Sequence, residues 1–161
     1  MKKQKGFSLI ELLIVVAIIL IIAAIAIPNL LRARISANES SAVGSVRTIN
    51  TSEVSYATSF PTVGFSKDLL SLAGNAKCTG ATPPTSTGAC LIDDTLAAGT
   101  KSGYVFTYGG LSGNVPEVTY TITANAAQIN QSGVRSFFSD QTGVIRAKNP
   151  GPGATVTDTP I

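Results

Sequence analysis

An apolar run near the start of the chain is long enough to cross a membrane. Leu12 to Ile27 are sixteen consecutive apolar residues, and the wider run from Phe7 to Ile27 has twenty-one residues, interrupted only by Ser8 and Glu11. As an α-helix, this run would be about 31 Å long at roughly 1.5 Å per residue, which matches a hydrocarbon core of about 30 Å. The run therefore predicts a membrane-spanning helix over residues 7–28. Its one acidic residue, Glu11, indicates a functional pairing, because a lone carboxylate is costly in apolar surroundings.

The residues in front of the run form a specific pattern. A short basic leader ends at Gly6, and Gly6-Phe7-Ser8-Leu9-Ile10-Glu11 leads into an apolar helix that carries Pro28. This pattern resembles the N-terminus of type IV prepilins and the related pseudopilins. The resemblance implies that a membrane peptidase removes residues 1–6 by cutting between Gly6 and Phe7, and that Phe7 is then N-methylated. It also implies that Glu11 pairs with the N-terminal amine of a neighbouring subunit during assembly, and that Pro28 lies in the assembly helix.

Other readings of the N-terminus fit these residues less well. A generic signal peptide has its cleavage site after a shorter apolar segment, whereas here the glycine precedes the run. A plain membrane anchor is the other alternative. Two positions depart from the family pattern: Ser8 stands where threonine is more common, and Leu20 stands where relatives commonly have glycine. In filaments of the family, the helix loosens just before the proline. Leu20 favours the helical conformation over glycine by up to about 1 kcal/mol, so this chain is expected to loosen less readily there.

The charge of the chain is a topology signal. The formal net charge is +3, but three lysines lie in the leader, and the remainder has nine basic and nine acidic side chains. A neutral mature chain without a basic cluster argues against specific nucleic-acid binding. Positive residues in front of a membrane helix keep that end in the cytoplasm, so the rest of the chain is expected outside it.

Residues 29–60 predict the amphipathic second half of one long helix. Pro28 is expected to kink the helix or to end it locally, and Phe60-Pro61 is expected to stop it. Apolar residues recur at steps of three, four and seven, and Glu53 is the one exception on the apolar face. We expect this face to bury Val43, Val46, Ile49 and Val54. The opposite, polar face is expected to contain Asn38, Glu39, Ser45, Arg47 and Asn50.

A globular head is predicted over residues 61–148, in two parts. Residues 61–102 form a long loop region, in which 67–72 and 93–98 each suit a single helical turn. The only two cysteines, Cys78 and Cys90, lie in this region. Outside the cytoplasm, a disulfide between them is the economical account, contributing about 3 kcal/mol on the loop-entropy model. A metal or redox pair is the alternative. Well-studied type IV pilins have their disulfide nearer the C-terminus, so this position is a departure.

Residues 103–148 predict an antiparallel sheet of four strands. Strands are predicted where apolar and polar residues alternate or where residues that favour strands are concentrated, at 104–108, 117–124, 134–139 and 144–147. In the second, Val118, Tyr120, Ile122 and Ala124 are expected to face the core. Residues 140–143 predict a hairpin turn with Gly143 at positive φ. Residues 149–161, rich in proline and glycine, are expected to be an ordered loop or a free tail. The fold class is therefore α+β, a pilin fold with the long helix packed on a four-stranded sheet.

No catalytic site and no cofactor is predicted. The chain has no histidine, so Ser-His and Cys-His pairs and imidazole metal sites are excluded. Asp93-Asp94 could contribute to a calcium site, but two adjacent acids more often form a turn or a helix cap. Three triplets match the N-glycosylation pattern, starting at Asn38, Asn50 and Asn130, and chance matches of this pattern are frequent.

Three classes of function remain. The resemblance favours a structural subunit of a type IV pilus for adhesion, motility or related functions. This subunit would be made in the inner membrane with its head outside the cytoplasm, and assembled into a homo-oligomeric surface filament. Its partners would be the prepilin peptidase and N-methyltransferase and the assembly machinery. A pseudopilin of a type II secretion system shares these features. A membrane-tethered periplasmic enzyme is the least supported class, because no catalytic constellation is present.

Overall fold

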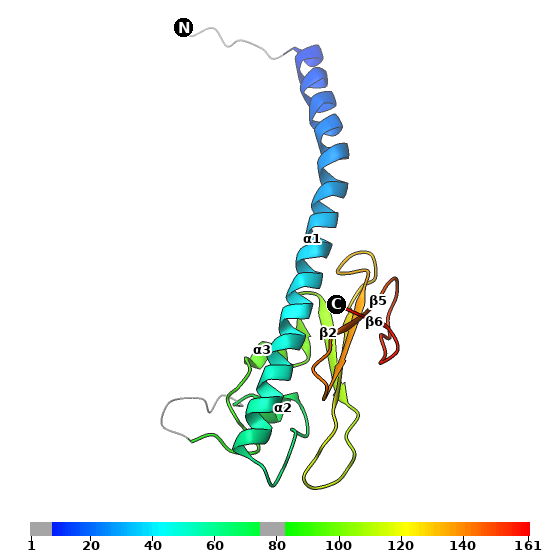
Figure 1. Ribbon diagram of the computed structural model, residues 1–161. Helices are drawn as coiled ribbons and strands as arrows, with labels where there is room; N and C mark the ends of the chain where they lie inside the picture. Colours follow the sequence, from blue (N-terminus) through cyan, green and yellow to red (C-terminus); the bar gives the residue numbers. More distant parts are fainter. Residues whose placement is uncertain (1–7, 75–82) are drawn as a thin grey trace, which may run out of the picture. The chain divides into compact units, whose positions relative to one another are not determined.

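The computed structural model describes residues 8–74 and 83–161 of the chain. Helix α1 (Leu9–Ser59) is continuous and contains Pro28 (Figure 1). The chain divides into two compact units, residues 1–34 and 35–161. The first consists, where described, of the exposed apolar part of α1. The second contains the rest of α1 and the head. The domain boundaries predicted at residues 28, 60 and 148 stay predictions.

The head contains one antiparallel sheet with six strands, so the prediction of four was wrong. The strands are adjacent in chain order: β1 (Thr100–Lys101), β2 (Tyr104–Gly109), β3 (Thr121–Ala126), β4 (Ser136–Asp140), β5 (Arg146–Lys148) and β6 (Thr159–Pro160). The four inner strands correspond to the four predicted ones. The two additional strands lie at the sheet edges and have two residues each, too few to produce an alternating sequence pattern. The α+β class is confirmed.

The turn between β4 and β5 is the predicted hairpin. The Gly143 amide donates to the Asp140 carbonyl at 2.9 Å, and Gly143 has a φ of 72°. The Asp140 carboxylate accepts from the backbone amide and the hydroxyl of Thr142, at 2.9 and 2.5 Å. A side chain that accepts from the residue two positions on stabilises such a turn, and glycine adopts the positive φ at little cost.

Strand β3 begins at Thr121, four residues later than predicted. Tyr120, Ile122 and Ala124 face the core as expected, but Val118 is 58% exposed. The reason is the side chain of Glu117, which accepts hydrogen bonds from the Ser112 and Gly113 amides at 2.7 and 2.9 Å and so closes the loop before β3. Residues 117–120 therefore alternate between polar and apolar side chains without being part of a strand.

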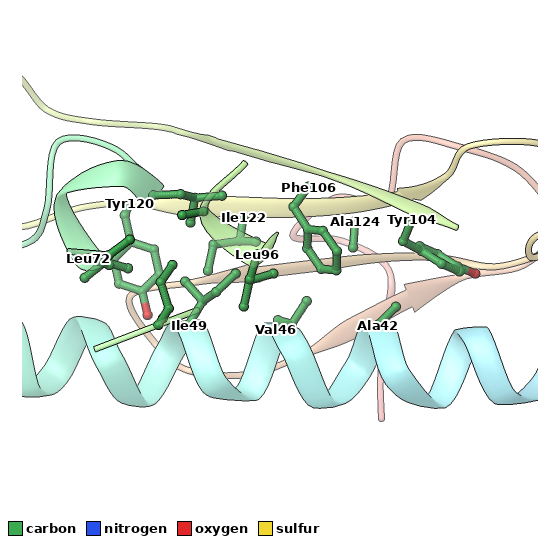
Figure 2. Packing of buried hydrophobic residues seen from close by; sticks show 14 of the residues in the cluster. Ala42, Val46, Ile49, Leu72, Leu96, Tyr104, Phe106, Tyr120, Ile122 and Ala124 are labelled. Atoms are coloured by element: carbon green, nitrogen blue, oxygen red, sulfur yellow. The ribbon is translucent and has the colours of Figure 1, made fainter. Parts of the chain in front are cut away.

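The core lies between residues 35–59 of α1 and the sheet (Figure 2). Ala42, Val46 and Ile49 point from α1 toward Phe106, Ile122 and other residues of the strands, as Figure 2 shows. Steps of four and three continue this stripe to Glu53 and Tyr56, which are also buried.

One residue expected on the stripe is not there. Val54 is 63% exposed, so the prediction that it is buried was wrong. Val54 lies about 100° around the helix from Glu53, and only one of the two positions faces the sheet.

Two short helices precede the sheet, where single helical turns were predicted. Helix α2 (Leu69–Leu72) begins after Asp68, whose carboxylate accepts from the Ser71 amide at 2.7 Å. Helix α3 (Asp94–Ala97) begins after Asp93, whose carboxylate accepts from the Leu96 amide at 2.9 Å. Each aspartate is thus an N-cap, which satisfies a free amide of the first turn.

The C-terminal segment is packed on the sheet and is not a free tail. Ala154 is buried, and its amide donates to the Ser136 hydroxyl at 3.0 Å. That hydroxyl in turn donates to the Gly151 carbonyl at 2.8 Å. The Ile161 amide donates to the Ile145 carbonyl at 3.0 Å, next to strand β6. Through Ser136, the inner strand β4 therefore holds the C-terminal segment on the sheet.

Candidate functional site

The candidate site is the N-terminal part of α1, where the assembly residues were predicted. The helix starts where the Ser8 carbonyl accepts hydrogen bonds from the amides of Glu11 and Leu12, at 3.1 and 3.2 Å. Glu11 is therefore in the first turn, where the positive end of the helix dipole favours an acid. Its side chain is exposed, and it makes no hydrogen bond or ion pair with any of the described residues.

Residues 12–27, which follow Glu11, are apolar on every face of the helix, and no other part of the described chain packs over their large side chains. All the large hydrophobic residues from Leu9 to Leu31 are exposed. Within the described residues, α1 is the one helix long and apolar enough to cross a membrane. A helix that is apolar all round requires an apolar environment, which either lipid or other copies of the same helix can supply.

Pro28 does not end the helix. It lies inside α1, where the missing amide leaves one backbone carbonyl of the preceding turn without its usual donor. Arg32 and Arg34 follow within two turns and are exposed. Long basic side chains at the end of an apolar helix can reach lipid headgroups. The predicted role of Pro28 in assembly stays a prediction.

The predicted processing site, Gly6 and Phe7, lies outside the described residues. Of the two cysteines, Cys78 also lies outside them. Cys90 follows directly after the buried Ala89, and its amide donates to the Ala73 carbonyl at 3.3 Å. The disulfide between Cys78 and Cys90 stays a prediction.

Thiol labelling tests the predicted disulfide. We expect denatured but unreduced protein to show no free thiol, because the head is predicted to lie in an oxidising compartment. After reduction, two thiols per chain should be labelled. Two labelled thiols before reduction would rule out the disulfide and favour the alternative of a metal or redox pair.

Glu39, predicted on the polar face of α1, is instead buried. Its Oε1 accepts from the backbone amides of Val134 and Arg135 at 2.9 and 3.0 Å, and its Oε2 accepts from the Arg135 Nε at 2.8 Å. Burial by itself would raise the pKa of Glu39, but these three hydrogen bonds and the nearby guanidinium together lower it. This ion pair joins α1 to the start of β4.

Asn50 is a second residue of the predicted polar face that is buried. Its Nδ2 donates to the Ser139 hydroxyl at 2.8 Å, and its Oδ1 accepts from the Tyr120 hydroxyl at 3.2 Å. Ser45 is buried as well. Burial makes Asn50 unsuitable for glycosylation, and the Nδ2 of Asn38 donates to the Ser132 carbonyl at 2.9 Å. Of the three triplets, only the one at Asn130 has an exposed asparagine without a hydrogen bond from its side chain among the described residues.

Sequence reasoning did not assign the roles of Glu39, Glu53 and Asn50. Polar residues in an amphipathic helix are normally assigned to the solvent face. The regular steps of four and three from Ala42 to Tyr56 were the available signal for Glu53. No comparable sequence signal exists for Glu39 or Asn50, because their partners are about ninety residues away in the chain.

The acids and cysteines of the described residues do not form a metal centre. No group of three or more such side chains comes together in residues 8–74 and 83–161. Asp93, one of the two candidate calcium ligands, forms an ion pair with Lys101 at 2.8 Å. The hydrogen bond from Lys101 and the Leu96 amide lower the pKa of Asp93. Asp93 is thus engaged in capping α3 and in an ion pair.

Comparison with known proteins identifies the N-terminal segment. Residues 1–27 match the family described as the prokaryotic N-terminal methylation motif. The chain is similar to the type IV wide pilus major component PilA4 of Thermus thermophilus, with 67% identity over 39 residues. It is also similar to the type IV major pilin protein PilA of Myxococcus xanthus, with 44% identity over 54 residues. No solved structure matches the chain significantly.

The matches to the two relatives cover only part of each chain. They cover 24% and 34% of this chain, and 30% and 24% of the two relatives' own lengths. Where the structure describes it, the chain combines an N-terminal methylation motif with an exposed apolar helix and an α+β head. The matched motif agrees with the pattern predicted around Gly6, and both relatives are named as type IV pilus or pilin proteins.

Proposed function

We propose that this chain is a structural subunit of a type IV pilus and not an enzyme. The observation that supports this most is the combination of the methylation motif with an exposed apolar segment of α1 whose first turn carries a carboxylate without a partner among the described residues. Both similar proteins are named as major components of type IV pili, which favours a filament subunit over a membrane-tethered enzyme.

The assembly step follows from the physics of the N-terminus. Removal of residues 1–6 would create a positively charged amine at Phe7, four residues before Glu11 in sequence. Contact between apolar helices gives little driving force to leave lipid, since both surroundings are apolar. A charge pair between Glu11 of one subunit and the Phe7 amine of its neighbour would supply that driving force and set the axial offset between subunits.

The partners and locations follow from this proposal. Before assembly, the chain would lie in the inner membrane with one span and the head outside the cytoplasm. A prepilin peptidase and N-methyltransferase would process it, and the pilus assembly machinery would add it to a homo-oligomeric filament on the cell surface. A pseudopilin of a type II secretion system is the second candidate, because it needs the same motif and helix. Long surface fibres that contain this chain would favour the pilus.

Mass spectrometry of the purified protein tests the processing step. We expect the chain to begin at N-methyl-Phe7, because Gly6 has no side chain to obstruct cleavage of the following peptide bond. Replacing Gly6 by a bulky residue should leave the leader in place and prevent fibre formation. An intact Met1 in assembled protein, or a cut beyond Ile27, would contradict the assignment as a prepilin.

A further inference from the structure

A buried carboxylate joins α1 to the segment that follows it. Glu53 is 0% exposed. Its Oε2 accepts a hydrogen bond from the Ser66 backbone amide at 2.9 Å, and its Oε1 accepts one from the Ser66 hydroxyl at 2.5 Å. Ser66 is also fully buried, and its carbonyl accepts from the Tyr108 hydroxyl of β2 at 2.9 Å. Glu53 thus connects α1, residues 61–68 and the sheet.

Among the residues that the structure describes, the titratable groups around Glu53 include no cation. They are three phenols from the elements packed around it, namely Tyr56 on α1, Tyr108 on β2 and Tyr120 on β3. Two carboxyl groups lie beyond these phenols: Asp68 acts on Tyr56, and Asp140 on β4 acts on Tyr120. Lys67 is exposed, and no ion pair joins it to Glu53 within the described part of the chain. Within residues 8–74 and 83–161, an ionised Glu53 is therefore stabilised by hydrogen bonds but by no opposite charge, in contrast to Glu39 with Arg135.

We propose that Glu53 is a proton-controlled latch, which holds residues 61–68 on α1 while its carboxyl is protonated and loosens this segment when the carboxyl ionises. Ionisation would place a charge in a fully buried site. Opening the segment would let water reach that charge, because Ser66 donates to both of its oxygens and would move with the segment.

The effect would extend beyond residues 61–68. The Phe65 amide donates to the Glu117 carbonyl at 2.9 Å, and the Glu117 amide donates to the Val63 carbonyl at 2.7 Å. A Cβ on Gly64 would lie 2.1 Å from the Glu117 carbonyl oxygen, so the two backbones are in close contact. Loosening residues 61–68 would therefore also release the loop between β2 and β3.

The direction of the pH dependence follows from the burial of Glu53. Burial raises the pKa of Glu53, and the hydrogen bonds from Ser66 and Tyr108 offset this only in part. For a carboxyl with a raised folded-state pKa, the stabilisation is present at low pH and is lost as the pH rises through that pKa. Within this window, each pH unit should lower the closed-to-open ratio of the latch up to about tenfold. Glu39, whose pKa is lowered, has the opposite dependence and loses its contribution in acid.

Hydrogen exchange of the purified full-length chain in detergent tests the latch. Exchange of residues 61–68 would be measured from pH 4 to 8 and corrected for the intrinsic rate at each pH. In the wild type, we expect protection to fall up to about tenfold per pH unit across the window. Glu53→Gln, which is always neutral, should keep protection independent of pH. The matched control Glu39→Gln should retain the wild-type dependence at residues 61–68.

Two results would overturn the latch: protection of residues 61–68 in the wild type that does not change with pH, or the same change in Glu53→Gln. Ser66→Ala gives a second test should Glu53→Gln not fold. It removes one donor to the carboxylate while leaving Glu53 in place, so the upper end of the window should move to higher pH while its lower end, set by the open state, stays. An upper end at the wild-type pH in Ser66→Ala would also contradict the latch.

Discussion

Glu11→Ala is expected to leave membrane insertion and leader cleavage intact while reducing fibre assembly about tenfold or more. The carboxylate is exposed in the first turn of α1 and has no partner among the described residues of its own chain. Loss of about 1.4 kcal/mol at each subunit contact is enough for a tenfold weaker association. The measurement is the amount of sheared surface fibre at equal total subunit, with the cleaved and uncleaved forms compared by mass.

Glu11→Gln separates charge from size in this experiment. It keeps the shape of the side chain and its capacity for hydrogen bonds, but it cannot pair with the Phe7 amine as an anion. We expect it to assemble nearly as poorly as Glu11→Ala. Wild-type fibre yield from either variant, with normal subunit levels, would refute the charge pair and leave Glu11 as a residue that only reaches the headgroup region.

Phe137→Ala is expected to lower the free energy of unfolding of the head by about 3–5 kcal/mol. Phe137 is 0% exposed in β4, where it is paired with Ala124 and Ala147. Its ring centroid lies 5.8 Å from that of Tyr104, and the Arg135 guanidinium lies 5.5 Å from it. Truncation would leave a cavity beside α1, and such a loss is a large fraction of the stability of a typical domain.

Val118→Ala is the matched control for Phe137→Ala. Val118 was predicted to face the core from the same strand pattern as Tyr120, yet it is 58% exposed. We expect its truncation to change stability by less than about 0.5 kcal/mol. Denaturant unfolding of the full chain would measure both variants. Comparable losses from the two would contradict the observed start of β3.

The local features of this chain were predictable because each depends on residues close together in sequence. The apolar run, the leader and Glu11 define the N-terminal motif within thirty residues. Asp68 and Asp93 cap helices that begin at the next residue. The turn that ends at Gly143 is closed by Asp140, three residues earlier.

The sequence by itself determined the α+β class, the four inner strands and the N-terminal motif, since helical and strand periods are set by neighbouring residues. Only the tertiary structure decided which of Glu53 and Val54 faces the sheet, because that depends on the rotation of α1 against partners far away in the chain. For the same reason, it alone decided that Glu39 and Asn50 are buried, each with a partner on or near β4. It also decided the edge strands β1 and β6, since a strand of two residues exists only through pairing with its neighbour.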